Sequence, residues 1–301
     1  MKGIGKNIWR YRYGYLFILP TMILLCIFNY YPAFSGLYHS LFDWAVGGES
    51  KFIGLRNFIE IISDKNFHAS VINVAKLTIW NLLVPTLIVP IFVAELIYNL
   101  HSQRAKYIYR VLVITPMVIP GIVNLLIWQF IYDADYGLLN AILKSIGLGH
   151  LSRSWLGDPN TALYAIMAMG FPWIGGTTVL IYLAGLMNIP ASVFDAALID
   201  GVVGLKRFFS IDLPLITSQI KLNIILSLIG TIQGYGTMLV LTGGGPGTST
   251  LVPGLYMYQA AFNYGRMGFA SAVGVLLFLV ILILTIINMR YISSPAEYEA
   301  Q

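Results

Sequence analysis

Six long apolar segments constrain the fold of this 301-residue chain more than any other feature of its sequence. They lie at about residues 15–35, 72–98, 108–132, 162–187, 216–241 and 267–289. At about 1.5 Å per residue, each can cross a hydrocarbon core of about 30 Å as a helix. None has the short apolar–polar alternation of membrane barrel strands, so we expect helices, which satisfy their own backbone groups in lipid. The prediction is an all-α integral membrane protein with six transmembrane helices in a single domain, 1–301.

Composition excludes the common alternatives. Hydrophobic residues make up 57% of the chain and charged residues only 10%, which is more apolar surface than one soluble core can bury. The net charge of +5 could suggest a nucleic-acid partner, but the basic residues flank apolar segments, where they set membrane topology, so we expect no nucleic acid. Because Cys26 is the only cysteine, an internal disulfide and a cysteine metal cluster are both excluded.

The distribution of lysine and arginine predicts that both termini face the cytoplasm. In that orientation eleven of the 18 basic residues fall inside, the side on which short loops carry most Lys and Arg. The segment between the fourth and fifth spans would then be cytoplasmic. The inside residues are Lys2, Lys6, Arg10, Arg12, Arg104, Lys106, Arg110, Lys206, Arg207, Lys221 and Arg290.

Residues 190–214, called the charged segment below, interrupt the apolar pattern with charges and glycines. Pro190 suits the first turn of a helix, and Ser192 and Asp195 fit the S/T-x-x-D/E pattern of a helix start. Gly201 suits the left-handed residue that ends a helix. The short helix between them would place Val193, Phe194, Ala197 and Leu198 on one face and Asp195 and Ile199 on another. From these residues alone, both a docking helix and an ordinary connection on the membrane surface stay open.

The charged segment also carries a family resemblance. Its pattern D-A-A-x-x-x-G, nine further residues and I-x-L-P resembles the cytoplasmic signature loop of permease subunits in binding-protein-dependent ABC importers. The usual first residue there is Glu, and this chain has the shorter Asp195. Residues 52–58, 136–140 and 242–246 are similar to motifs of the sugar branch of that family, the maltose and glycerol-phosphate permease type.

This resemblance implies a fold, partners and a location. The fold would be that of a type I ABC importer permease in a bacterial-type cytoplasmic membrane. The partners would be a second permease subunit in a heterodimer, two cytoplasmic ABC ATPase subunits, an extracytoplasmic solute-binding protein, the sugar and membrane lipid. The charged segment would be the coupling helix that enters a groove on the ATPase. The implied coupling residues are Asp195, Ala196, Ala197, Gly201, Ile211, Leu213 and Pro214.

The chain itself is not expected to be an enzyme or to bind a cofactor. No G-x-x-x-x-G-K-S/T phosphate-binding motif occurs, so ATP hydrolysis would take place on a separate subunit. The four histidines have no metal-ligand spacing, and no nucleophile-elbow pattern is present. We therefore expect no catalytic residues and no metal site.

Polar and aromatic residues inside the spans are the candidates for a substrate pathway. Such side chains tend to face a bundle interior or a cavity, and together they suit the mixed faces of a sugar, although they could equally join helix to helix. Lys76 and Glu95, near the ends of the second span, are expected to reach the membrane surface instead. The pathway candidates are Asn124, Trp128, Trp173, Thr177, Ser227, Thr231 and Gln233.

The glycine-rich stretch 242–250 cannot be helical, because three glycines precede a proline there. We expect an ordered loop, which could line the outer mouth of a pathway, with a flexible connector as the alternative.

Two other functions stay open. The same coupling loop could belong to an ABC permease for a non-sugar solute. An ion-coupled secondary transporter would be expected to show a buried charge in the middle of a span and internal repeats, and neither is found.

Overall fold

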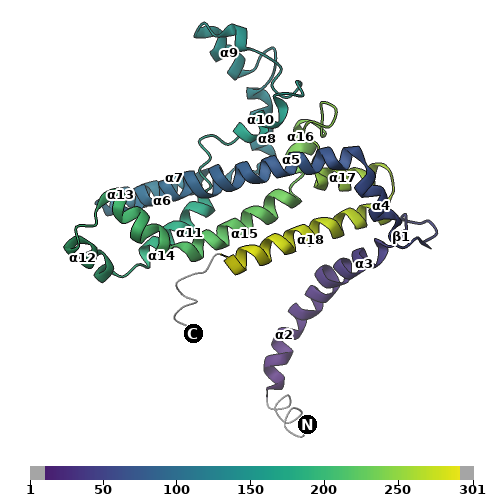
Figure 1. The fold of residues 1–301 in the computed structure, drawn as a ribbon, viewed down its shortest axis with the longest axis horizontal. Helices are drawn as coiled ribbons and strands as arrows, with labels where there is room; N and C mark the ends of the chain where they lie inside the picture. Colours follow the sequence, from purple (N-terminus) through teal and green to yellow (C-terminus); the bar gives the residue numbers. More distant parts are fainter. Residues whose placement is uncertain (1–10, 292–301) are drawn as a thin grey trace. The chain divides into compact units, whose positions relative to one another are not determined.

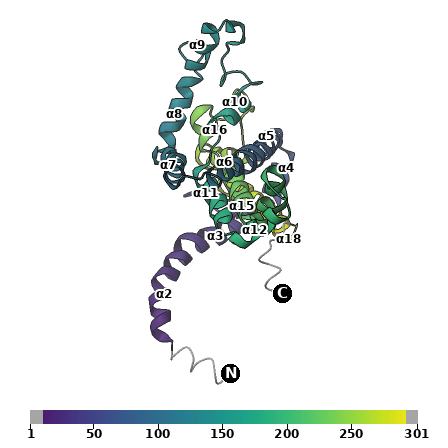
Figure 2. The same cartoon turned by 90° about the vertical axis from the view of Figure 1, so that its left-hand side faces the viewer.

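The computed structural model describes residues 11–291, which are mostly helical (Figures 1 and 2). Their contacts divide the chain into two units, Met1–Ser63 with Met257–Leu276 and Asp64–Tyr256 with Leu277–Gln301. Lys2, Lys6 and Arg10, on which the predicted orientation partly depends, lie outside the described residues, as do both termini.

The first unit begins with the first predicted span. Helices α2 (Arg12–Leu25), η1 (Cys26–Tyr30) and α3 (Tyr31–His39) form one stretch of 28 residues. Every side chain of α2 is exposed in the isolated chain. An apolar helix with this exposure is suited to contact with lipid.

A buried asparagine explains the motif at residues 52–58. Strands β1 (Phe42–Asp43) and β2 (Lys51–Phe52) pair antiparallel and are followed by α4 (Arg56–Ser63). Asn57 is 3% exposed, and its amide donates to the carbonyls of Ser40 and Phe42 at 2.9 and 3.0 Å. These bonds hold α4 against the end of the first span.

The second unit is built on one helical stretch of 34 residues, called the long helix below, formed by α5 (Lys65–Asn81), η2 (Leu82–Ile88) and α6 (Val89–Tyr98). The Asp64 side chain accepts the Asn66 backbone N–H at 2.6 Å and so caps its start. In chain order, the remaining helices of both units are α7 (Gln103–Ile114), η3 (Thr115–Val118), α8 (Gly121–Ile131), α9 (Leu138–Ser145), η4 (Gly149–Leu151), α10 (Ala162–Ala168), α11 (Gly176–Met187), α12 (Ala191–Ile199), α13 (Gly204–Arg207), η5 (Phe208–Asp212), α14 (Leu213–Leu215), α15 (Thr217–Gln233), α16 (Gly236–Leu241), α17 (Pro253–Tyr258), η6 (Gln259–Asn263) and α18 (Met267–Tyr291).

The described helices allow between four and six membrane spans, and six were predicted. Among residues 11–291, four helical stretches are long and apolar enough to cross a membrane, and two bent helix pairs could bring the number to six. The four stretches are Arg12–His39, Lys65–Tyr98, Thr217–Leu241 and Met267–Tyr291.

The predicted span 108–132 is wrong as a single helix, because the chain bends by 86° between η3 and α8. Ile119 precedes Pro120 and is extended (φ −72°, ψ 124°), since the proline ring disfavours a helical conformation in the residue before it. Pro120 then starts α8 as its N-cap. The sequence therefore contained the signal for this break.

The predicted span 162–187 is also interrupted. Helix α10 ends at Ala168 and α11 begins at Gly176, with Gly170 at φ 76° and Trp173 at φ 58° between them. Gly170 adopts this left-handed backbone at no steric cost, and Pro172 cannot supply a helical N–H. In a membrane, irregular backbone of this kind has to be buried in protein or line a cavity.

Tyr182 on α11 lies at the centre of the core of the second unit. It is fully buried among side chains of α6 and α11, including Ile91 and Leu186. Its hydroxyl donates to the Thr86 carbonyl at 3.1 Å. Because Pro90 has no N–H, Thr86 lacks its helical donor four residues on, and Tyr182 supplies one. This bond fixes the position of α11 along the long helix at Thr86.

Candidate functional site

The charged segment contains the short helix that its sequence predicts, with a different start. Helix α12 begins at Ala191, its N-cap is Pro190, and no side chain caps it. The prediction that Ser192 and Asp195 form the start pattern is therefore wrong. Pro190 itself sets the boundary with an extended conformation (ψ 140°). Figure 1 shows α12, α13 and α14 together at one end of the second unit and α16 toward its other end.

Gly201 ends α12 as predicted. It lies at φ 68°, its N–H donates to the Leu198 carbonyl at 3.2 Å, and the next N–H, of Val202, reaches back to Ala197 at 2.8 Å. This pair of bonds is the Schellman arrangement, which needs a left-handed residue at that place.

We expect Gly201→Val to weaken this helix end. A Cβ there would meet no atom within 4 Å, so the cost comes from the left-handed backbone alone, about 1–2 kcal/mol for a residue other than glycine. Amide hydrogen exchange at Val202 should accelerate about tenfold. Gly201→Asn, which tolerates this conformation, should change the exchange less, and equal rates in the two variants would contradict the explanation.

The faces of α12 differ from the prediction. Ala197 is 4% exposed and Val193 and Phe194 are half-buried, so they face their own chain. Leu198, predicted on the same face, is 64% exposed, and Ile199 is 87% exposed. The outward face therefore combines two large apolar side chains with exposed Asp195 and Ala196.

The other implied coupling residues lie where the charged segment meets the fifth span. Ile211 is in η5, and Leu213 and Pro214 are in α14. Leu213 packs against the core of the second unit, whereas Pro214 is exposed. The fifth span proper starts at Thr217, after a break at Ile216.

An ion-pair network that the sequence analysis missed joins the charged segment to α6. Arg207 Nε donates to Asp212 Oδ2 at 2.9 Å, and Nη2 lies 3.2 Å from Glu95 Oε1 and 2.7 Å from Asn99 Oδ1. The Asp212 side chain is 1% exposed and that of Glu95 15%. Glu95 thus faces this network, and the prediction that it reaches the membrane surface is wrong. Burial would lower the pKa of Arg207, but the hydrogen bond and charge of Asp212, with the charge of Glu95, raise it.

Both helix breaks line one cavity of about 610 Å³, called the polar cavity below. Gly121 starts the helix after the first break and Gly170 lies in the second. The polar groups around it come from four helical regions and include two of the predicted pathway residues. Its polar and aromatic lining is Asn81, Asn124, Thr231, Tyr235 and Thr237.

A smaller cavity of about 380 Å³ continues this polar lining between η2 and α15. The Thr86 hydroxyl donates to Ser227 Oγ at 2.9 Å, and the Asn81 amide to Thr231 Oγ1 at 3.2 Å. Thr177 lines the same cavity. Ser227 and Thr231 therefore bond one helix to another and also line a cavity. Both predicted roles, helix–helix contact and pathway lining, apply to them.

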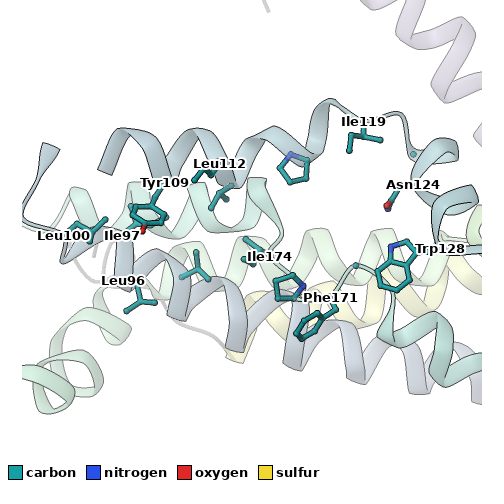
Figure 3. A pocket seen from close by; sticks show the side chains of 16 residues that line it. Leu96, Ile97, Leu100, Tyr109, Leu112, Ile119, Asn124, Trp128, Phe171 and Ile174 are labelled. Atoms are coloured by element: carbon teal, nitrogen blue, oxygen red, sulfur yellow. The ribbon is translucent and has the colours of Figure 1, made fainter. Parts of the chain in front are cut away.

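The remaining pathway candidates are distributed differently. Trp128 and Asn124 lie at one end of a mostly apolar cavity of about 830 Å³, and Leu100 and Tyr109 lie at the other (Figure 3). The Trp173 indole donates to the Met167 carbonyl at 3.2 Å and packs edge-on against Trp80, which places it within the second break. Gln233 is exposed and lines none of these three cavities.

The glycine-rich loop 242–250 is fixed by hydrogen bonds. Thr250 is fully buried, and its hydroxyl lies 2.7 Å from Thr242 Oγ1 and 2.9 Å from the Gly245 carbonyl. From α5, the Asn73 amide donates to the carbonyls of Thr248 and Leu251 at 2.8 and 2.9 Å. The loop is therefore ordered, as predicted, and is attached to the long helix.

We expect Asn73→Ala to loosen this loop. The change leaves two carbonyls without their donor, at a cost of about 1–3 kcal/mol if water cannot replace it. Amide exchange over residues 242–251 should rise. Ser249→Ala is the matched control, because the buried Ser249 hydroxyl has no hydrogen-bond partner among the described residues. Slower or unchanged exchange in Asn73→Ala would contradict the role of the two bonds.

A protein-family match covers most of the second unit. The model of a family described as "binding-protein-dependent transport system inner membrane component" matches residues 86–295. The matched range contains the charged segment, the ion-pair network and most of the polar cavity.

Curated relatives and solved structures match nearly the whole chain. The trehalose/maltose transport system permease protein MalF of Thermococcus litoralis is 32% identical over 280 residues, 93% of each chain. The multiple sugar-binding transport system permease protein MsmF of Streptococcus mutans is 29% identical over 92% of this chain and 94% of its own. A chain of a bacterial alginate ABC transporter, solved with an alginate-bound periplasmic protein, is similar in fold, with a TM-score of 0.82, 23% identity and 95% coverage of both chains.

Proposed function

This chain belongs to the family of inner membrane components of binding-protein-dependent transport systems, and from that premise we propose that it forms half of the translocation pathway of an ATP-driven importer for a carbohydrate. The family match over residues 86–295 carries the proposal, since it includes the charged segment and most of the polar cavity. The relatives named for trehalose, maltose and multiple sugars favour a sugar or an oligosaccharide over other solutes.

In this proposal, α12 is the coupling helix that docks onto a cytoplasmic ATPase. Its outward face offers a carboxylate at Asp195 beside Leu198 and Ile199, which suits an apolar groove with a basic residue at its edge. Ala196 would let the partner approach closely. Because Ala197 is buried in its own chain, we assign it to holding α12 in place rather than to the contact. Gly201, Ile211, Leu213 and Pro214 would set the position of the helix.

The polar cavity is proposed as part of the sugar pathway. Irregular backbone at membrane depth is expected where it lines a cavity, and both broken helices contribute to this one. Amide and hydroxyl groups at Asn81, Asn124 and Thr231 could bond sugar hydroxyls, and Tyr235 supplies an aromatic ring. Trp128, Thr177 and Ser227 would extend the pathway, whereas Trp173 and Gln233 line none of the three cavities.

The proposed assembly contains two permease chains, as a heterodimer, two ATPase subunits that hydrolyse ATP, and an extracytoplasmic solute-binding protein. The bent pair of α7 and α8 would count as one span, and α10 with α11 as another, because α12 would lie in the cytoplasm. With the four long helical stretches, this gives the chain six spans in a single permease domain. Both termini and the charged segment would face the cytoplasm of a bacterial-type cell.

Purification of a tagged copy of this chain in mild detergent from its native cells tests the proposal. Mass spectrometry should identify a P-loop ATPase and a second permease with six spans in the preparation. Recovery of the chain alone, or with partners that include no ATPase, would refute the importer assignment and reopen the secondary-transporter alternative.

A further inference from the structure

Arg207 is the point at which the charged segment is bonded to the long helix. Its guanidinium contacts Asp212 within the segment and Glu95 and Asn99 at the end of the long helix. The Asn99 amide in turn donates to Glu95 Oε1 at 2.6 Å. One cation therefore serves two carboxylates that are mostly removed from water.

Helix α12 is attached to the same point through an aromatic side chain. Arg207 lies over the ring of Phe194, 5.2 Å from its centroid. The Phe194 ring also contacts Tyr98, the last residue of α6, with centroids 5.9 Å apart. Phe194 of α12 therefore contacts both the guanidinium and the end of α6.

The long helix extends from this point to the cavities. It runs without a break from Lys65 to Tyr98, about 50 Å at the helical rise, and contributes Asn81 to the polar cavity and Thr86 to the smaller one. Tyr182 fixes α11 on it at Thr86. A continuous helix can carry a movement from one end to residues along its length.

We propose that Arg207, together with Glu95 and Asp212, is the positioning group that transmits movement of α12 to the long helix and so to the polar cavity. This inference rests on the proposed coupling function of α12. Loss of Arg207 leaves two buried carboxylates without their cation, which both weakens the local fold and disconnects the two elements.

A single-cysteine reporter tests this transmission without knowledge of the substrate. Cys26→Ser removes the only cysteine, and Thr237→Cys then places a thiol in the lining of the polar cavity. The complex with its co-purified ATPase is reconstituted in lipid vesicles, and the rate of labelling by a small maleimide is measured with and without ATP and vanadate. In the reporter protein without further substitutions, the labelling rates with and without ATP and vanadate should differ by about fivefold or more.

Arg207→Gln should abolish the ATP-dependent change while the ATPase stays bound in a pull-down. Arg207→Lys should keep part of the ATP-dependent change, because the positive charge is retained. The change should be smaller than in the parent, because one ammonium group cannot make both contacts of the planar guanidinium. Lys206→Gln, at the exposed neighbouring base, should behave as the parent.

A neutral triple variant, Glu95→Gln/Arg207→Gln/Asp212→Asn, separates transmission from stability. It removes the unpaired carboxylates, so the thermal stability of the complex should recover relative to Arg207→Gln, while the ATP-dependent labelling change should stay lost. Recovery of that change in the triple variant, or its persistence in Arg207→Gln, overturns the inference and leaves the proposed function intact. If the parent reporter itself shows no change with ATP, the proposed function fails and the inference falls with it.

Discussion

Asp195→Lys is expected to abolish uptake by the importer while the protein still inserts into the membrane. Asp195 is exposed on the outward face of α12, so the change removes no contact within the chain, but it places a cation where the ATPase would offer one. Loss of one partner from a desolvated charge pair costs about 2–5 kcal/mol, which weakens ATPase binding by about 30-fold or more. Retention of the ATPase on the tagged chain and uptake by cells are the two measurements.

Two variants control for nonspecific effects of charge. Asp195→Glu keeps the carboxylate and should keep both the ATPase and uptake. Asp200→Lys reverses another exposed acid, at the C-cap of the same helix, where a cation is favourable to the helix dipole. Parental uptake in Asp195→Lys, or an equal loss in Asp200→Lys, would exclude the specific role of Asp195.

Gly230→Trp should block transport from inside the pathway. Gly230 lines the polar cavity, and a Cβ built on it meets no atom within 4 Å. An indole there can enter the cavity without displacing a neighbouring helix, and it covers about 150–250 Å² of lining that a sugar would otherwise use. Uptake should fall to background, while the ATPase should still co-purify, because the charged segment is unchanged.

Side-chain size provides the control for this variant. Gly230→Ala adds only the Cβ for which there is space and favours a helix by about 1 kcal/mol, so uptake should match the parent. Uptake should decrease from alanine through leucine to tryptophan. Full transport by Gly230→Trp would show that the sugar does not pass through the polar cavity.

The sequence predicted the helical class and the position of each apolar segment, because length and hydropathy determine which segments can occupy lipid. It did not predict that two of these segments are broken, although Pro120 and the Gly170–Pro172 stretch carried the signal. Hydropathy averages over a window and is insensitive to a single proline, whereas the backbone responds to that one residue.

The candidate site was predicted only in part, because sequence patterns indicate local features and not contacts between distant residues. Gly201 and the exposed carboxylate of Asp195 follow from local patterns within a few residues, and the structure has both where they were expected. The pairing of Arg207 with Glu95 could not be found in that way, because the two residues lie 112 positions apart along the chain. Only the packing of α6 against the charged segment brings them together.

The exposure of α2 has a consequence for the order of events during synthesis. The helix emerges from the ribosome before the helices that follow it in this sequence, and every one of its side chains is exposed, so none is buried by a later part of the chain. Asn73, Asn81 and Thr86 on the long helix depend instead on acceptors or donors that are translated more than 90 residues later. The first span can therefore insert into the bilayer as soon as it is made. The long helix can complete its hydrogen bonds only after the chain that follows the fifth span has been synthesised.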